Sequence, residues 1–159
     1  MKKLIVFAWL FLVGVACSSD DNKIEKPFEP RQLEMETILQ GNDCRHYDIS
    51  TERTFIVWED RDSWELFKID FNRFIPDFEA TILNEWVVDF NSEMVIVVLD
   101  QQRLYGGYSI DVVHVEEDVL NVVVNIDQVL KGGINAVLTR PYHIVKIPKL
   151  GKPVVFEEL

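Results

Sequence analysis

Apolar and polar positions recur with two different periods along this chain of 159 residues, and the two periods separate strands from a helix. Thr54–Trp58 is rich in β-branched and aromatic residues, which indicates a strand. Soon afterwards, four aromatic residues recur at intervals of three and four positions, which predicts the apolar face of a helix. These residues are Trp64, Phe67, Phe71 and Phe74.

The helix is expected over about residues 62–74. Asp62 and Glu65 have the spacing of a capping box, in which the first side chain accepts from the amide of the residue three positions on. Pro76 lies just beyond the expected end, where a proline cannot continue the helix. Residues 78–83 are expected to add a short helical turn.

Strand patterns dominate the rest of the chain. Residues 94–99 are apolar at every position, which predicts a central strand buried on both faces. One early amphipathic helix followed by many strands predicts an α+β fold with a mainly antiparallel sheet. Further strands are expected over residues 33–39, 85–90, 108–116, 120–127, 142–147 and 154–156, with a hairpin turn at Glu117-Asp118 and a loop over residues 131–135.

The N-terminus has the pattern of an export signal. Met1-Lys2-Lys3 is followed by an apolar run to Val13 and by the small residues Gly14-Val15-Ala16. Cys17 comes next, as in a bacterial lipoprotein signal. We therefore expect residues 1–16 to be removed and the Cys17 thiol to carry fatty-acyl chains such as palmitate. A cleaved signal that releases a soluble protein is the alternative, whereas the run is short for a retained membrane-spanning helix.

Residues 17–30 are expected to be a flexible tether, because they are polar and acidic and contain two prolines. Residues 31–159 then form a single domain by length. The run Ser18-Ser19-Asp20-Asp21 resembles acidic export signals of surface-exposed lipoproteins, and a solvated linker without an address function is equally open. The expected location is the cell envelope, as an outer-membrane lipoprotein.

The net negative charge of the chain disfavours some classes of binding partner. The chain has 16 lysine and arginine residues against 27 aspartate and glutamate residues, a formal net charge of −11. A surface this acidic repels phosphate, so nucleic acid is not an expected partner. Adsorption on anionic lipid is disfavoured as well, so contact with the membrane is expected through the acyl chains alone.

Catalytic and metal-binding patterns are weak. The sequence has three histidines but no Gly-x-Ser-x-Gly motif around a serine nucleophile. Cys44 and His46 could form a thiolate–imidazolium pair or supply two zinc ligands, but a buried structural cysteine is favoured. The run Glu59-Asp60-Arg61-Asp62 is not followed by the glycine of a calcium loop, and its acidic residues suit a helix N-terminus. We expect no enzyme activity, no metal and no cofactor.

The best candidate for binding is the run Leu104-Tyr105-Gly106-Gly107-Tyr108. Its two glycines permit positive φ values and the close approach of a partner's backbone. Tyr105 and Tyr108 supply contact area at low entropic cost. Six aromatic residues could alternatively form an exposed face for a glycan, although aromatic residues are more often core. They are Trp58, Trp64, Trp86, Tyr105, Tyr108 and Tyr142.

Four motifs in the second half of the chain occur in a recognisable order. They are Val88-Asp89-Phe90, residues 94–98, Gly106-Gly107-Tyr108-Ser109-Ile110 and residues 139–148, which contain Pro141-Tyr142-His143. Together they resemble the C-terminal domain family of the protease-complex subunit PrcB, over about residues 54–150. The resemblance implies a secreted or lipid-anchored bacterial protein that accompanies and stabilises a secreted protease, with no catalytic residues to carry over.

Several functions stay open. The leading hypothesis is a non-catalytic envelope lipoprotein that binds or stabilises a protein partner, such as a secreted protease, through Tyr105, Gly106, Gly107 and Tyr108. The alternatives are a protease inhibitor that presents the same loop, a glycan-binding surface lipoprotein and an unrecognised enzyme. The sequence leaves the oligomeric state open.

Overall fold

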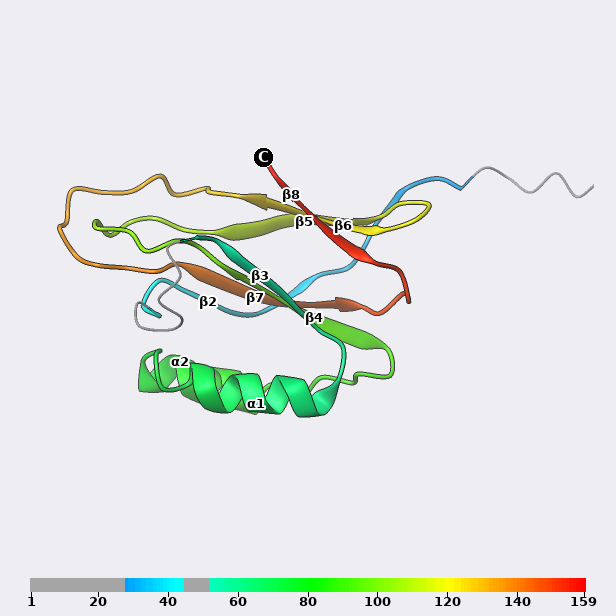
Figure 1. Ribbon diagram of the computed structural model, residues 1–159, viewed down its shortest axis with the longest axis horizontal. Helices are drawn as coiled ribbons and strands as arrows, with labels where there is room; N and C mark the ends of the chain where they lie inside the picture. The colour runs from blue at the N-terminus through cyan, green and yellow to red at the C-terminus, as the bar shows by residue number, and fades with distance from the viewer. Residues whose placement is uncertain (1–27, 45–51) are drawn as a thin grey trace, which may run out of the picture.

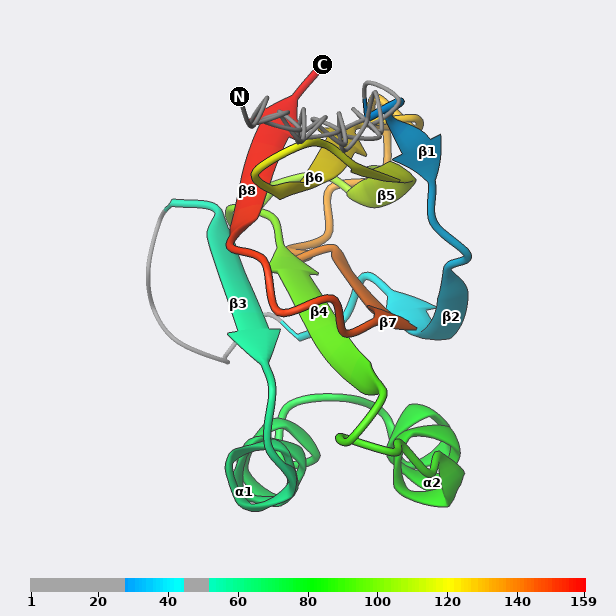
Figure 2. The same ribbon diagram turned by 90° about the vertical axis from the view of Figure 1, so that its right-hand side faces the viewer.

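The computed structural model describes residues 28–44 and 52–159, which form three layers (Figure 1, Figure 2). The outer sheet consists of β1 (Arg31–Gln32), β5 (Asp111–Glu117), β6 (Val122–Asp127) and β8 (Val154–Glu158). The middle sheet consists of β2 (Glu36–Gly41), β7 (Tyr142–Pro148), β4 (Glu93–Leu99) and β3 (Thr54–Trp58). The helices α1 (Arg61–Phe71) and α2 (Asp77–Glu85) cover the other face of the middle sheet. The predicted α+β class is confirmed.

Both sheets are almost entirely antiparallel, as expected. Within the described residues, only β6 and β8 run parallel to each other. The predicted single sheet is in fact two sheets. A strand pattern reports which faces are apolar but not which strands are neighbours, so the sequence did not separate them.

Strand β4 connects the two hydrophobic cores, as its unbroken apolar run predicted. Val95 and Val97 point towards the helices and belong to the core between α1, α2 and the middle sheet, which we call the helix-side core. Met94 and Ile96 belong to the core between the two sheets, which we call the sandwich core. Both faces of β4 are therefore covered, and its residues 94–99 are completely or almost completely buried.

Helix α1 buries the predicted aromatic face but starts and ends earlier than expected. Its N-cap is Asp60, not Asp62, because the extended Asp60 backbone lets its carboxylate accept from the Ser63 amide at 2.8 Å. The helix ends at Phe71, and Phe74 lies in the following tight turn. The rings of Trp64, Phe67 and Phe71 pack in series, with centroids 5.5 and 5.0 Å apart.

Residues 77–90 differ most from the prediction. The expected short turn is the complete helix α2, and the expected strand over residues 85–90 is absent. Asp89 accounts for the missing strand, because its carboxylate accepts from the amide and side chain of Asn91 and from the hydroxyl of Ser92. Such local hydrogen bonds favour a turn over a strand ladder.

The first predicted strand is divided between the two sheets. β1 pairs with β5 in the outer sheet and β2 pairs with β7 in the middle sheet, so the chain crosses from one sheet to the other between them. Leu33 lies at this crossing and is buried in the sandwich core. The strand expected from residue 108 starts at Asp111, and the Glu117-Asp118 hairpin joins β5 to β6 as predicted.

The predicted signal at residues 1–16, Cys17 and most of the predicted tether lie outside the described residues, as does His46. Within the described part of the chain, neither helix is long and apolar enough to cross a bilayer.

Candidate protein-binding surface

Two long connections meet at one end of the molecule (Figure 1). The first runs from β4 to β5 over residues 100–110, and the second runs from β6 to β7 over residues 128–141. They expose a group of apolar side chains that we call the end surface. Its members are Leu104, Tyr105, Val129, Leu130, Ile134 and Val137, and their exposed fractions run from 42% for Val137 to 96% for Ile134.

Two glycine pairs, Gly106-Gly107 and Gly132-Gly133, hold these connections together. The amide of Gly133 donates to the Gly106 carbonyl at 2.8 Å, and the amide of Gly132 donates to the Gly107 carbonyl at 3.0 Å. Gly107 and Gly132 have φ values of 80° and 98°, which other residues rarely adopt. A Cβ atom on Gly107 would lie 3.0 Å from the Gly133 nitrogen. The glycines were expected to allow the close approach of a partner's backbone. They instead allow the two loops of the same chain to approach each other.

The two tyrosines of the loop have different surroundings. Tyr105 is 48% exposed, and its carbonyl accepts from the Thr139 hydroxyl at 3.1 Å. Tyr108 is half-buried, and the Arg103 guanidinium lies 4.8 Å from its ring centroid. Tyr108 also occupies the space that a Cβ atom on Gly132 would need. Tyr105 is therefore available to a partner, whereas Tyr108 mainly supports the loop.

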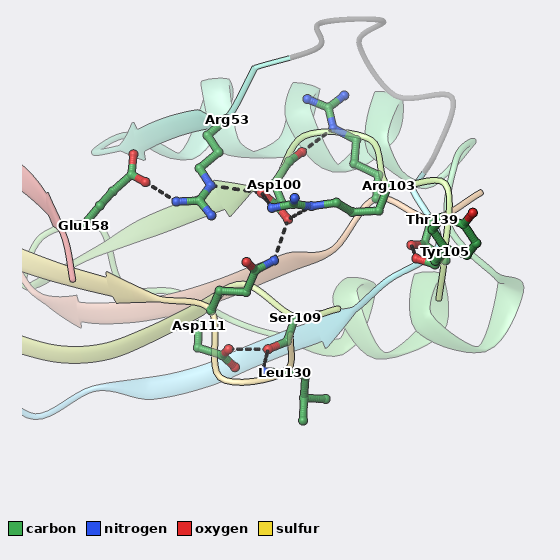
Figure 3. A network of polar contacts seen from close by, with 11 residues as sticks. Arg53, Asp100, Arg103, Tyr105, Ser109, Asp111, Leu130, Thr139 and Glu158 are labelled. Carbon is green, nitrogen blue, oxygen red and sulfur yellow. Dashed lines mark hydrogen bonds and ion pairs between the residues drawn. The ribbon is translucent and has the colours of Figure 1, made fainter. Parts of the chain in front are cut away.

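The buried side chain of Asp100 anchors the first connection through ion pairs (Figure 3). Its side chain is completely buried and accepts from Nε of Arg53 at 3.0 Å and from Nε of Arg103 at 2.8 Å. Nη2 of Arg103 adds a contact at 3.1 Å, and the Asp100 carbonyl accepts from Nε of Arg140 at 2.9 Å. Arg103 in turn pairs with Thr139 through its backbone in both directions. The buried carboxylate therefore fixes the direction in which the loop leaves β4.

This ion network was not predicted from the sequence. The available signal is an aspartate that directly follows the all-apolar strand β4, with an arginine three positions later. A carboxylate at such a place must be buried, and a buried carboxylate requires charged partners. Arg53 and Arg140 are distant in the sequence, so their participation could not be read from spacing.

The second connection is attached to the start of β5 in a similar way. The Ser109 hydroxyl and the Asp111 carboxylate are hydrogen-bonded, and Ser109 Oγ also accepts from the Leu130 amide at 3.0 Å (Figure 3). The Asp111 carboxylate accepts from the Val129 amide at 3.1 Å. Backbone groups beside two exposed apolar side chains are thereby satisfied, which orders the segment that carries them.

Cys44, the potential nucleophile, and His143 are both unsuited to catalysis, whereas His46, the predicted partner of Cys44, lies outside the described residues. Burial raises the pKa of the Cys44 thiol to about 12, and its sulfur donates to the Arg140 carbonyl at 3.2 Å, which confirms the structural interpretation of this residue. Burial lowers the pKa of the His143 imidazole to about 4, and both ring nitrogens are hydrogen-bonded. No group of three metal-ligating side chains occurs among residues 28–44 and 52–159.

The six aromatic residues do not form a common exposed face. Trp64 and Tyr142 are buried in the helix-side core, and Trp58 and Trp86 pack against it. Of the six, Tyr105 is the most exposed, with 48% of its surface accessible. A flat platform of rings, as a glycan would require, is therefore not built from these residues.

One hollow of the described structure adjoins the end surface, and a larger one lies apart from it. The first, of about 280 Å³, lies beside the glycine pairs and is lined in part by Asn42, Gly106 and Val137, so it is continuous with the end surface. The larger one, of about 500 Å³, lies near Glu93, where Lys146 Nζ contacts Glu36 at 3.1 Å and Glu93 at 2.8 Å. The polar groups of the larger hollow thus compensate one another.

Residues 94–148 match the family model described as PrcB C-terminal. The match starts in β4 and ends in β7, so it includes both connections of the end surface, and it covers about a third of the chain. The predicted resemblance is confirmed over this segment, and the family is an accessory, non-catalytic type of domain. No curated protein and no solved structure matches the chain.

Proposed function

We propose that this protein is a non-catalytic binding module that holds a protein partner at its end surface, with a secreted protease as the first candidate. The observation that carries this proposal is a contrast within two loops. Their backbones are fixed by the glycine pairs and by Asp100, while six apolar side chains remain exposed to solvent. Preorganised backbone lowers the entropic cost of association, and clustered exposed apolar residues mark contact sites.

The family match supports this function, because it places the end surface within a segment similar to an accessory domain of a protease complex. Leu104, Tyr105 and Ile134 are the expected main contacts. Tyrosine is common among the residues that dominate binding energy in interfaces. Gly106 and Gly107 contribute by fixing the loop, and Tyr108 contributes by supporting it.

The matched test compares aspartate substitutions at two ends of the molecule. The full chain would carry a tag and be expressed in bacterial cells together with a candidate secreted protease. Leu104→Asp and Ile134→Asp should each reduce retention of the protease about tenfold, which corresponds to about 1.4 kcal/mol. Leu120→Asp is the control, because Leu120 is 71% exposed but lies in the β5–β6 turn at the opposite end (Figure 1). Equal retention by all variants would rule out the end surface.

Protease inhibition is the second candidate function, and one observation favours it. Leu104 is 75% exposed beside a backbone held by Arg103 and Thr139, so it could enter the specificity pocket of a protease. Activity and lifetime of the protease separate the two functions. A stabiliser prolongs the lifetime without lowering the initial rate, whereas an inhibitor lowers the initial rate and loses this effect in Leu104→Asp.

We also propose that acyl chains on Cys17 hold the domain at the cell envelope, in the outer membrane. The motivation is the sequence before Cys17, and more than one chain would be needed for stable attachment. Mass spectrometry of the N-terminal peptide should find an acylated Cys17, and Cys17→Ser should release the protein from membranes. An unmodified, freely soluble wild-type chain would contradict the anchor but not the partner-binding function.

A further inference from the structure

The two sheets have four edge strands, and three of them carry features that oppose pairing with another chain. β1 is only two residues long. β2 has a register shift between Thr37 and Leu39, and β8 carries the charged residues Glu157 and Glu158. Short length, bulges and charges are the usual protections of an exposed strand edge.

β3 has none of these protections. Thr54–Trp58 contains no charged residue, no proline and no glycine, and its five residues pair with β4 without a register shift. All five are half-buried, since no described strand covers their outer side (Figure 2). An apolar strand with a regular edge is a template for the addition of another strand.

The residues at the two ends of β3 suit a second copy of the same strand as the occupant. Arg53 precedes the strand and Glu59 follows it. Arg53 is partly exposed and pairs with Asp100 and Glu158 of its own chain, and Glu59 is exposed and pairs with Lys149 at 3.7 Å. If two copies of β3 pair antiparallel about a twofold axis through Ile56, Arg53 of each copy lies opposite Glu59 of the other. Opposite charges in directly facing positions stabilise strand pairs.

The same register also continues both hydrophobic cores. Phe55 lies opposite Val57 of the second copy, and both residues pack against the sandwich core. Ile56 lies opposite Ile56, on the face that packs against the helix-side core. A register shifted by one residue would pair opposite faces, because successive side chains point to opposite sides of a strand.

We propose that this protein forms a dimer through antiparallel pairing of β3 with β3 of a second copy, centred on Ile56. The two middle sheets join into one continuous sheet, and both helix layers lie on the same face of it. Because β3 starts next to the end of β4, the two end surfaces lie at opposite ends of the dimer. Dimer formation is independent of the partner-binding function.

The test is site-directed disulfide formation in the full chain, expressed in the bacterial envelope and treated with a mild oxidant. Directly facing residues of an antiparallel pair have Cα atoms about 4.5–5.5 Å apart, within the range of a disulfide. Ile56→Cys should therefore give a covalent dimer on non-reducing electrophoresis. Val57→Cys is the matched control, because Val57 would face Phe55 and lie too far from its own counterpart. The unaltered chain controls for its natural cysteines.

Two further measurements keep the outcome decisive. Glu59→Lys in the Ile56→Cys chain should lower the dimer yield severalfold, because lysine would then face Arg53. The unaltered full chain, extracted in detergent, should sediment as a dimer and Ile56→Lys as a monomer. A monomeric unaltered chain, equal cross-linking at positions 56 and 57, or cross-linking of Ile56→Cys to a different polypeptide alone would overturn the proposal.

Discussion

The backbone amide of Val112 donates a hydrogen bond of 3.0 Å to Nδ1 of His143, and this bond joins the outer sheet to the middle sheet. Because Nδ1 accepts, the ring proton is on Nε2, which donates to the Thr37 hydroxyl at 2.9 Å. The register shifts of β2 and β5 begin at these two neighbours, Thr37 and Val112. The neutral imidazole thus satisfies polar groups at two strand irregularities at once.

This arrangement predicts a loss of stability in mild acid. The pKa of His143 is lowered from 6.5 to about 4 in the folded protein, chiefly by burial. The unfolded chain therefore binds a proton more readily, and the stabilisation present above pH 6.5 is lost as the pH falls towards 4. The loss attributable to His143 should reach about 3 kcal/mol, measured by urea unfolding across this range.

His143→Gln provides the control, because a glutamine amide can accept from Val112 and donate to Thr37 without titrating. The difference in unfolding free energy between the two proteins should change between pH 6.5 and 4 and stay constant outside that window. A constant difference at every pH would show that His143 does not account for the acid sensitivity.

The glycine pairing predicts a large effect of a single methyl group. Gly132→Ala would place Cβ 2.4 Å from Cζ of Tyr108 at a φ of +98°, so we expect a destabilisation of about 2–3 kcal/mol. Gly151→Ala is the control, because Gly151 also has a positive φ but no atom within 4 Å of the new Cβ. It should cost about 1 kcal/mol. Similar denaturation midpoints for the two variants would contradict the close packing of the loops.

The buried carboxylate of Asp100 should be far more important for stability than an exposed one in a comparable pair. Asp100→Ala leaves Arg103 and Arg53 without their shared partner, and we expect a loss of about 3–5 kcal/mol. Asp70→Ala removes another aspartate that pairs with an arginine three positions on, Arg73, but here both side chains are exposed. Its effect should stay below about 1 kcal/mol. Chemical denaturation of both variants tests the contrast.

The thiol of Cys44 should resist alkylation in the native protein. Its pKa of about 12 leaves very little thiolate at pH 8, and the side chain is completely buried. Iodoacetamide should modify Cys44 only after unfolding, as followed by mass spectrometry of the peptide that contains this residue. Rapid alkylation under native conditions would reopen the possibility of a reactive cysteine.

Local patterns in the sequence predicted most of the strands and the aromatic face of α1. The apolar run of β4 also correctly predicted its central position, because only a strand covered on both sides lacks polar residues. The pattern failed at residues 85–90, where the side-chain hydrogen bonds of Asp89 override the strand propensity of Trp86, Val87 and Val88. It also failed at the cap of α1, because Asp60 and Asp62 are both plausible capping residues.

The candidate surface was only partly predictable, for a different reason. The Leu104–Tyr108 run was recognised from its composition, and its Tyr105 is exposed. The roles of Gly106 and Gly107 depend on Gly132 and Gly133, which lie 26 residues further along the chain. The ion network depends similarly on Arg53 and Arg140. Contacts between distant segments have no period or spacing by which the sequence could reveal them.

Strand β4 also limits which substitutions the fold can accept. Its alternate side chains enter two separate cores, so a change of volume at Ile96 disturbs the packing between the sheets, whereas one at Val97 disturbs the packing beneath the helices. The segment similar to the PrcB C-terminal family starts at Met94 and ends at Pro148, and α1 and α2 lie outside it. A substitution in β4 disturbs one core or the other according to its position, and a polar side chain is therefore unfavourable at even and odd positions alike.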